Sequence, residues 1–444
     1  MTSPTSEELE RLREHFNYGP YPRIPIEESP KEAYERLYCH NFVTPYYLHH
    51  RRVPNLQGKI ILDAGCGSGY KSLILAEANP GAKIVGIDLS EKSVELAQQR
   101  LKFHGFANTE FHAIAIEELP KLGLMFDYIN CDEVLYLLPD PLAGLQALAA
   151  VLKPDGLLRT NLHNFHQRAN FYRAQSLFQL MGVAEVGLGE FAEQAVVETM
   201  DSLHEFVALK EQTWQGRFRD SNRPELISEL IGANHLLVGD KGFTIPDLFA
   251  LLEGANLEFV SMVNWRHWDL TDLFKDAENL PALWEMGLAT ASVQDRLYLY
   301  QLLHPVHRLL DFWCAHPGES GAAVEEWSEA DWQTATVHLH PQLKVDRLKQ
   351  DLIDCFRSGQ PFEISKLVPL PALTPVFLNA STAACLLPLW ESAQPIAAIV
   401  ARYQQIHPVD PATLEPIDEA QAFEQVKDLL NRLDAFLYVL LERA

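Results

Sequence analysis

The 444-residue sequence contains no long hydrophobic run, and its first residues carry no obvious targeting signal. No apolar stretch approaches the roughly 18 residues that cross a bilayer, so no membrane span is predicted. The opening segment, MTSPTSEELERLREHF, lacks the apolar core of a secretory signal and the arginine-rich balance of a transit peptide. These absences predict a cytoplasmic protein.

Paired cysteines and basic residues are also scarce. The six cysteines, at positions 39, 66, 131, 314, 355 and 385, form no CxxC pair, which is typical of reduced thiols. The histidine-rich fragments HNFHQR and LLHPVHR come without HExxH or paired cysteines, so no metal site is predicted. The formal charge of −24 disfavours a nucleic-acid partner, because such binding gains from counterion release at a basic surface.

The pattern of apolar residues predicts an α/β fold. A chain of this length is expected to form two or three domains. Short apolar segments alternate with helical patterns, which indicates a doubly wound, mostly parallel, Rossmann-like sheet with helices on both faces. Ligands of such sheets bind at the carboxyl ends of the strands. The five predicted strands are residues 59–64, 83–88, 109–114, 126–131 and 156–162.

The remaining sequence divides into flanking segments. Residues 1–54 are predicted as a helical or lid segment, in which tyrosines either line a pocket or pack a helix onto the domain. Residues 165–240 read as a helical insertion after the core of 55–164, either a substrate lid above the strand ends or a remote helical domain. The sheet continues over 241–265, followed by an accessory region, 266–385. The tyrosines are Tyr18, Tyr21, Tyr38, Tyr46 and Tyr47.

The last segment, 386–444, is predicted to be a small helical or winged-helix-like domain. Its closing helix places six apolar residues on one face, which must be buried against something. The preceding helix, with a stripe from Ile396 to Ile406, offers a matching partner, and a homodimer contact is the alternative. The six residues are Phe423, Val426, Leu430, Leu433, Leu437 and Leu440.

A glycine-rich turn carries the main functional signal. The stretch KIILDAGCGSGYKSLILAEANPGAKIVGIDLS reads as a strand, a turn, a helix and a second strand that ends in an acid. Gly65, Gly67 and Gly69 allow close backbone approach to a flat, polar cofactor. Asp88 is placed to accept hydrogen bonds from a pair of ribose hydroxyls. The turn therefore predicts a nucleoside-containing ligand.

The spacing of these glycines bears on the choice of cofactor. A dinucleotide site typically has G-x-G-x-x-G, whereas this turn has G-x-G-x-G. Tyr70 stands where the third dinucleotide glycine would fall, and its side chain obstructs the close helix approach that glycine permits. An NAD-dependent oxidoreductase is therefore disfavoured but stays as an alternative.

Several segments together carry a family resemblance. ILDAGCGSG resembles the first motif of the class I S-adenosylmethionine (AdoMet)-dependent methyltransferases, with a type 11/12-like core. GIDLS, FHAIAIEELP, FDYINCDEVLYLLPDP and VLKPDG resemble the motifs that follow, and FTIPDLFALLEGANLEFVSM resembles the later helix and strand. The resemblance covers about residues 55–163 and 243–263. It implies AdoMet as cofactor and methyl transfer as the reaction.

The resemblance also implies a set of cofactor contacts. Ala115 stands where many relatives carry an acid that meets the adenine amino group, so a neighbouring backbone carbonyl is expected there. In the other implied contacts, Gly65, Gly67 and Gly69 pass beside the methionine moiety, Asp63 orients its ammonium group, Asp88 holds the ribose, Leu89 and Ile116 sandwich the adenine, and Asn130 and Cys131 offer backbone groups near the methionine.

The methyl acceptor is not identified by the sequence. Displacement at a sulfonium methyl relies mainly on alignment in a water-poor pocket. Asp132, Glu133, Tyr136 and His163 are candidate bases, with structural roles as the alternative. The predicted function is therefore methyl transfer to a small metabolite or a protein side chain. A catalytically silent AdoMet-binding regulator, whose carboxyl-terminal domain recruits a partner, is the second alternative.

Overall fold

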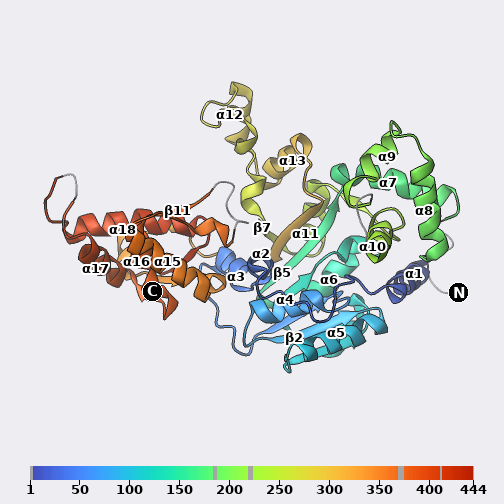
Figure 1. Ribbon diagram of the computed structural model, residues 1–444, viewed down its shortest axis with the longest axis horizontal. Coiled ribbons are helices and arrows are strands. Elements are labelled where there is room, and N and C mark those ends of the chain that lie inside the picture. Colours follow the sequence, from blue (N-terminus) through green and yellow to red (C-terminus); the bar gives the residue numbers. More distant parts are fainter. Residues whose placement is uncertain (1–3, 184–187, 219–223, 369–374, 411–412, 444) are drawn as a thin grey trace.

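An eight-stranded sheet forms the centre of the computed structural model, which describes residues 4–183, 188–218, 224–368, 375–410 and 413–443 (Figure 1). The order is β3-β2-β1-β4-β5-β8-β7, and β6 (Gly242–Phe243) pairs with β5. Neighbours among the first five strands are parallel, and β8 is antiparallel to β5 and β7. The predicted doubly wound, mostly parallel sheet is confirmed. The main strands are β1 (Ile60–Ala64), β2 (Lys83–Asp88), β3 (Thr109–Ala113), β4 (Phe126–Cys131), β5 (Leu152–Asn164), β7 (Glu258–Met262) and β8 (Leu309–Ala315).

Local sequence explains where the core helices begin. The Ser90 side chain caps the helix after β2 by accepting a hydrogen bond from the Ser93 backbone N–H. Asp140 caps the helix after β4 in the same way, with Pro141 at the first position. Each cap therefore fixes the residue at which its helix begins. The helices packed on the sheet are α2 (Tyr34–His40), α3 (Val43–His50), α4 (Tyr70–Ala78), α5 (Glu91–Phe103), α6 (Pro141–Val151), α11 (Ile245–Gly254) and α13 (Val293–Leu303).

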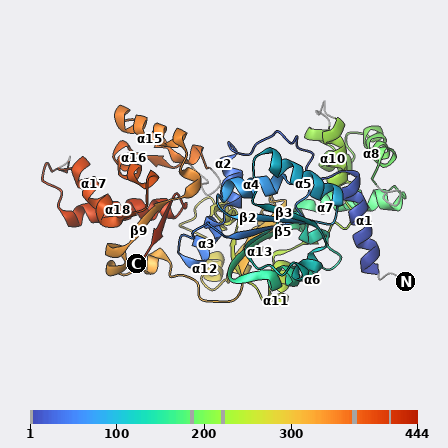
Figure 2. The ribbon, with the colours of Figure 1, turned by 90° about the horizontal axis from the view of Figure 1, so that it is seen from below.

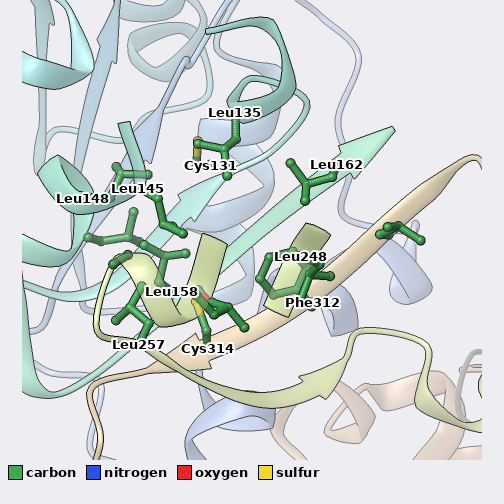
Figure 3. Packing of buried hydrophobic residues seen from close by; sticks show 14 of the residues in the cluster. Cys131, Leu135, Leu145, Leu148, Leu158, Leu162, Leu248, Leu257, Phe312 and Cys314 are labelled. Carbon is green, nitrogen blue, oxygen red and sulfur yellow. The ribbon is translucent and has the colours of Figure 1, made fainter. Parts of the chain in front are cut away.

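Helices cover both faces of the sheet (Figure 2). One face packs against α6, α11 and α13 in a cluster of buried residues that includes Leu145, Leu158, Leu248 and Phe312 (Figure 3). The other face packs against α3, α4 and α5, with Trp313 of β8 fully buried among them. Burial on both faces explains why the strands read as continuous apolar runs.

The far edge of the sheet differs from the expectation in one respect. The helix and strand predicted from FTIPDLFALLEGANLEFVSM are confirmed as α11 and β7. However, β7 does not pair with β5, because β8 lies between them. No strand was predicted at β8, whose residues LLDFWCA begin 47 positions after the last residue of β7.

Two segments lie at the carboxyl ends of the strands. The first is α1 (Pro4–Tyr18), which contacts α5. The second is the helical insertion after β5, which has its own small apolar cluster that includes Phe178, Met200 and Trp214. Parts of the predicted insertion, residues 184–187 and 219–223, lie outside the described residues. Its helices are α7 (Phe165–Leu180), α8 (Glu190–Ser202), α9 (Ala208–Thr213) and α10 (Pro224–Asn234).

The carboxyl-terminal unit combines helices with a three-stranded antiparallel sheet of order β12-β9-β13. Its apolar cluster extends from Val324 to Leu441 and includes Tyr38 and Tyr47 of the amino-terminal helices. A second sheet pairs β10 (Phe362–Glu363) with β11 (Phe377–Leu378). The other elements are α14 (Glu329–Thr334), β9 (Thr336–Leu339), α15 (Asp346–Ser358), α16 (Ala380–Leu386), β12 (Gln394–Pro395), α17 (Ile396–Ile406), α18 (Glu419–Asp434) and β13 (Val439–Glu442).

The predicted closing helix is shorter than expected. The apolar face of α18 packs against α17, which confirms the intramolecular partner. The extension of the helix to Leu440 is wrong, because α18 ends at Asp434 and Leu437 adopts a left-handed conformation with φ +53°. The chain turns there, and Leu440 pairs with His338 as part of β13.

None of the helices in the described ranges combines the length and apolar character that crossing a membrane requires.

Candidate active site

The glycine-rich turn connects β1 to α4 at the edge where the parallel strands end. Gly65, Gly67 and Gly69 all have positive φ, at +79°, +49° and +79°. A Cβ atom at Gly65 would overlap the Val134 side chain, and one at Gly67 would overlap the Tyr21 carbonyl oxygen. The turn therefore needs glycine for both its backbone conformation and its close contacts.

Asp88 closes the turn from the neighbouring strand. Its Oδ2 accepts a hydrogen bond from the Gly67 backbone N–H at 2.9 Å, and its Oδ1 accepts one from the Ser90 N–H at 2.8 Å. Burial raises the pKa of Asp88 to about 6, although both backbone N–H groups lower it. A carboxylate thus lies at the end of β2, beside the glycine turn.

A cavity of about 390 Å³ opens above these groups. Its volume falls in the range of sites that bind small molecules. Residues from the ends of β1 to β4 form its floor, and α1, the loop after it and the insertion form the rest of the wall. Of the predicted site residues, those that line it are Gly65, Gly67, Asp88, Leu89, Ile116, Glu133 and Tyr136, together with Asp132.

The other predicted cofactor residues lie behind this surface. Asp63 is buried and accepts hydrogen bonds from Ser72 at 2.6 Å and from the Asn130 amide at 2.9 Å. Cys131 is fully buried, and burial raises the pKa of its thiol to about 12. Gly69 faces α5, because a Cβ atom there would overlap Ala97. These four residues support the turn and the strand ends from below.

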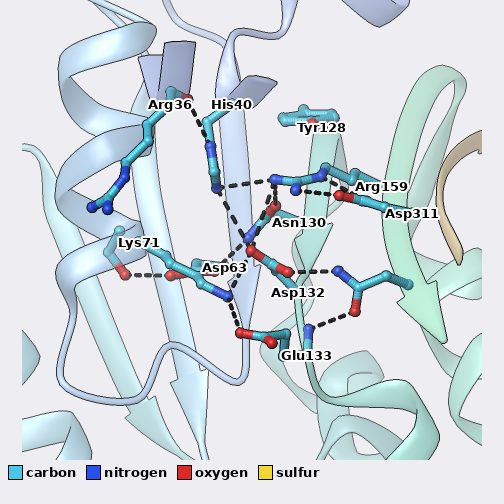
Figure 4. A network of polar contacts seen from close by, with 12 residues as sticks. Arg36, His40, Asp63, Lys71, Tyr128, Asn130, Asp132, Glu133, Arg159 and Asp311 are labelled. Carbon is cyan, nitrogen blue, oxygen red and sulfur yellow. Dashed lines mark hydrogen bonds and ion pairs between the residues drawn. The ribbon is translucent and has the colours of Figure 1, made fainter. Parts of the chain in front are cut away.

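Charged side chains form a continuous network under the cavity floor (Figure 4). The Lys71 ammonium lies 2.6 Å from Asp132 and 3.2 Å from Glu133. Asp132 also accepts a hydrogen bond from Asn161 at 2.6 Å. Burial raises the pKa of Asp132, but Lys71 and Arg159 outweigh it, and the net pKa lies well below its usual range. This network keeps both acids ionised next to the cavity.

Glu133 has a second cationic partner, Arg308, from the segment before β8. The Arg308 guanidinium donates to the Glu133 carboxylate and also lines the cavity. Burial raises the pKa of Glu133, yet Lys71 and Arg308 lower it more, to about 2. Glu133 also adopts a left-handed conformation, with φ +65°. Its carboxylate is therefore a fixed, weakly basic group.

Tyr136 and His163 stack on each other beside this ion pair, with ring centroids 3.7 Å apart. His163 Nδ1 lies 2.6 Å from Asp240, and its Nε2 lies 3.0 Å from Arg308. Burial lowers the pKa of His163 to about 4 and raises that of Tyr136 well above its usual range. A neutral His163 then donates through Nδ1 and accepts at Nε2, so both nitrogens are engaged. Tyr136 faces the cavity, whereas His163 lies behind it.

The amino-terminal segment lies against the glycine turn. The Ser68 backbone N–H donates to the Tyr21 carbonyl oxygen at 2.8 Å. Tyr18 and Tyr21 line the cavity, as predicted for a pocket-lining role. Tyr46 of α3 packs on Phe42, and Tyr38 and Tyr47 pack in the carboxyl-terminal cluster. Of the five tyrosines, two thus line the pocket and three pack helices onto the domain.

The insertion completes the wall opposite the strands. Residues of α10, including Ser228 and Glu229, line the cavity. The Arg23 backbone N–H donates to Glu229 at 3.0 Å, which links the amino-terminal segment to the insertion. Neither these contacts nor Lys71, Arg308 and Asp240 were predicted from the sequence. No local motif marks them.

Comparisons with known proteins agree with this geometry. Residues 55–215 match a family model described as a methyltransferase domain. A ubiquinone biosynthesis O-methyltransferase from Bordetella avium is 40% identical over 106 residues, which are 23% of this chain and 42% of that protein. The uncharacterized protein syc1184_c from Synechococcus is 26% identical over 320 residues, or 71% of this chain and 73% of that protein.

Solved structures show the same fold. PKMT2 from Rickettsia typhi superposes with a TM-score of 0.55 at 16% identity, covering 95% of this chain and 78% of that one. Its complex with AdoHcy gives a TM-score of 0.54 at 15% identity, covering 91% and 76%. Residues 55–215 form a methyltransferase domain whose fold is that of the class I AdoMet-dependent enzymes, and AdoMet is the cofactor that such a domain implies. The chain spans less than half the length of the ubiquinone methyltransferase.

Proposed function

We propose that the whole chain transfers a methyl group from AdoMet to a nucleophilic atom of a small metabolite or a protein side chain. The observation that carries this proposal is the position of Asp88. Its carboxylate is hydrogen-bonded to the glycine turn, and the carboxylate and the turn line the same cavity. AdoMet supplies a methyl group on a sulfonium and is left as S-adenosylhomocysteine (AdoHcy). The chain's own residues hold and align the reactants.

The residues that line the floor of the cavity fit this cofactor. The glycine turn leaves room for the methionine moiety beside Gly65 and Gly67. The Asp88 carboxylate accepts hydrogen bonds from the ribose hydroxyls. Leu89 and Ile116 offer apolar surfaces for the two faces of the base. The residues that support this surface from below are Asp63, Gly69, Asn130 and Cys131. Asp63 orients the ammonium group of the methionine moiety without contacting it directly.

Alignment and exclusion of water are the main catalytic contributions in this proposal. Glu133 and Tyr136 contact the substrate that accepts the methyl group. Glu133 accepts a hydrogen bond from this substrate, and Tyr136 donates one to it. His163 positions both Tyr136 and Arg308 from behind. Since Glu133 is a weak base and His163 has both nitrogens engaged, the site favours an acceptor atom that reaches it deprotonated.

The insertion and the amino-terminal segment act as the substrate lid in this proposal. Both contribute walls to the cavity and contact each other through Arg23 and Glu229. We also propose a cytoplasmic location, supported by six cysteines that are all free thiols. The homodimer stays a prediction, which sedimentation analysis of the purified protein tests.

Calorimetric titration with AdoMet, AdoHcy and NAD tests the central proposal. Saturable binding of AdoMet and AdoHcy, and none of NAD, is the expected result. Loss of AdoHcy binding in Asp88→Ala, with the unfolding temperature retained, would support the placement of the ribose. Failure of the wild-type protein to bind either AdoMet or AdoHcy would overturn the proposal. AdoMet with a labelled methyl group, added to a cell extract, then separates protein acceptors from small-molecule acceptors.

A further inference from the structure

Two tyrosine hydroxyls at one end of the cavity are available to a ligand. Tyr21 and Tyr136 both line the cavity, and neither hydroxyl makes a hydrogen bond within the described part of the chain. The charge of Glu133, together with burial, raises the pKa of Tyr21 to about 12, and burial raises the pKa of Tyr136 well above its usual range. Both hydroxyls therefore keep their protons at pH 7 and can donate a hydrogen bond.

Arg308 adds further donors at the same end. Its Nη2 donates to Glu133 and its Nη1 lies 3.0 Å from His163 Nε2, so two contacts fix the orientation of the guanidinium. These partners leave its other N–H groups for a ligand, and the side chain is partly exposed to the cavity. Tyr21 and Tyr136 lie close enough to Arg308 to influence its pKa. The three side chains Tyr21, Tyr136 and Arg308 are called the donor cluster below.

The groups beside the donor cluster are poor bases. Both nitrogens of His163 are engaged, at 2.6 Å and 3.0 Å from their partners. The Glu133 carboxylate has a depressed pKa of about 2 and contacts two cations, which offset its charge towards an incoming anion. Glu229, on the opposite wall, already accepts a backbone N–H at 3.0 Å. An amine or a phenol would have to lose a proton here without help, whereas a carboxylate arrives ionised.

We propose that the methyl acceptor is a carboxylate oxygen held by the donor cluster, and that the product is a methyl ester. This inference rests on the proposed function. A lone pair of the carboxylate oxygen attacks the methyl carbon, the bond from that carbon to sulfur breaks, and its electron pair stays on the sulfur of AdoHcy. No proton has to leave, so the step needs no base. A hydroxyl or amino group beside the carboxylate donates to Glu133.

The stability of the product towards base tests this assignment. The full chain is incubated with AdoMet that carries a labelled methyl group and with the protein and low-molecular-mass fractions of a cell extract. Mild base hydrolyses a methyl ester to volatile labelled methanol, whereas N-methyl groups and methyl ethers stay in place. We expect most of the label to be released, and the fraction that carried it distinguishes a protein carboxylate from a free carboxylic acid. Base-stable label would overturn the inference and leave the proposed function intact, whereas absence of any transfer would overturn the proposed function.

The pH dependence of the transfer rate at saturating AdoMet is a second test. A carboxylic acid has an ordinary pKa of about 4, so the rate should change by less than about twofold between pH 7 and pH 9. A phenol or an amine has a pKa of about 10, and its rate would rise by up to about tenfold per pH unit over this range. Such a rise would contradict a carboxylate acceptor.

Arg308→Gln removes the cationic member of the donor cluster, and Arg173→Gln is the matched control. Arg173 is exposed on α7, donates to Gln212 at 2.6 Å and does not line the cavity. We expect Arg308→Gln to lower kcat/KM for ester formation by at least about tenfold, as for a charge-assisted hydrogen bond, while AdoHcy affinity stays within about twofold. Arg173→Gln should change neither quantity.

Two results would overturn the role of Arg308. One is a kcat/KM in Arg308→Gln equal to that of the wild type. The other is a loss of AdoHcy affinity as large as the loss of kcat/KM, which would place the guanidinium at the cofactor instead of the acceptor.

Discussion

Lowering the pH from 7 to 5 is expected to weaken AdoHcy binding by about tenfold, because it protonates Asp88. Both carboxylate oxygens of Asp88 already accept backbone hydrogen bonds, and burial raises its pKa to about 6. Ribose hydroxyls donate to the ionised form. Below pH 6 the proton must leave before the ligand binds, so each further pH unit weakens binding by up to about tenfold. Affinity should therefore rise from pH 5 to 6 and level off towards pH 7.

Calorimetry across this range measures the effect directly. The carboxyl and amino groups of AdoHcy titrate mainly outside pH 5 to 7, so the ligand contributes little. Asp88→Asn removes the titrating group, and its affinity should be weaker at pH 7 and nearly independent of pH. Histidines elsewhere would affect both proteins alike. Equal wild-type affinity at pH 5 and pH 7, or the same slope in both proteins, would refute the reasoning.

Three further substitutions test the turn and the ion pair. Gly67→Ala and Gly105→Ala both place a side chain at positive φ, which should lower the free energy of unfolding by about 1 kcal/mol in Gly105→Ala and by more in Gly67→Ala. Only the Cβ at Gly67 would overlap the Tyr21 carbonyl oxygen, so only Gly67→Ala should weaken AdoHcy binding, by at least about tenfold. Similar binding by the two variants would contradict this. Arg308→Met should lower stability by about 1 kcal/mol at pH 7, a modest value because the Arg308 side chain is 44% exposed. Glu133 has a depressed pKa of about 2, so this contribution is present above its unfolded-state pKa and is lost as the pH falls towards 2. Urea unfolding at pH 7 and pH 3.5 checks this, and an equal effect at both would count against the ion pair.

The first five strands and the glycine turn were predictable because their signals are local. Each strand is a short apolar run bounded by turn residues, and the helix after β2 carries its own cap at Ser90. Asp88 is the last residue of one of these strands, so the prediction of the strand also placed Asp88 at its end. Parallel pairing then brought it beside the turn, where it accepts the Gly67 N–H.

The polar network around the cavity was not predictable in the same way. Arg308 contacts Glu133 across 175 residues of sequence, and Asp240 contacts His163 across 77. Such pairs depend on where β8 and the insertion return to the sheet, which no local pattern specifies. The strand β8 itself was missed, because an apolar run of seven residues cannot by itself be told from part of a buried helix.

The predictable residues and the unpredictable residues line different walls of the cavity. Residues next to the proposed cofactor come from strand ends and the glycine turn, which the parallel sheet positions by its own geometry. The opposite wall comes from α1, from α10 and from Arg308, three segments widely separated in sequence. The match to the ubiquinone methyltransferase spans only 106 residues and therefore cannot include all three. Substrate preference should thus respond to exchange of α10 residues, whereas AdoHcy affinity should respond to the turn and Asp88.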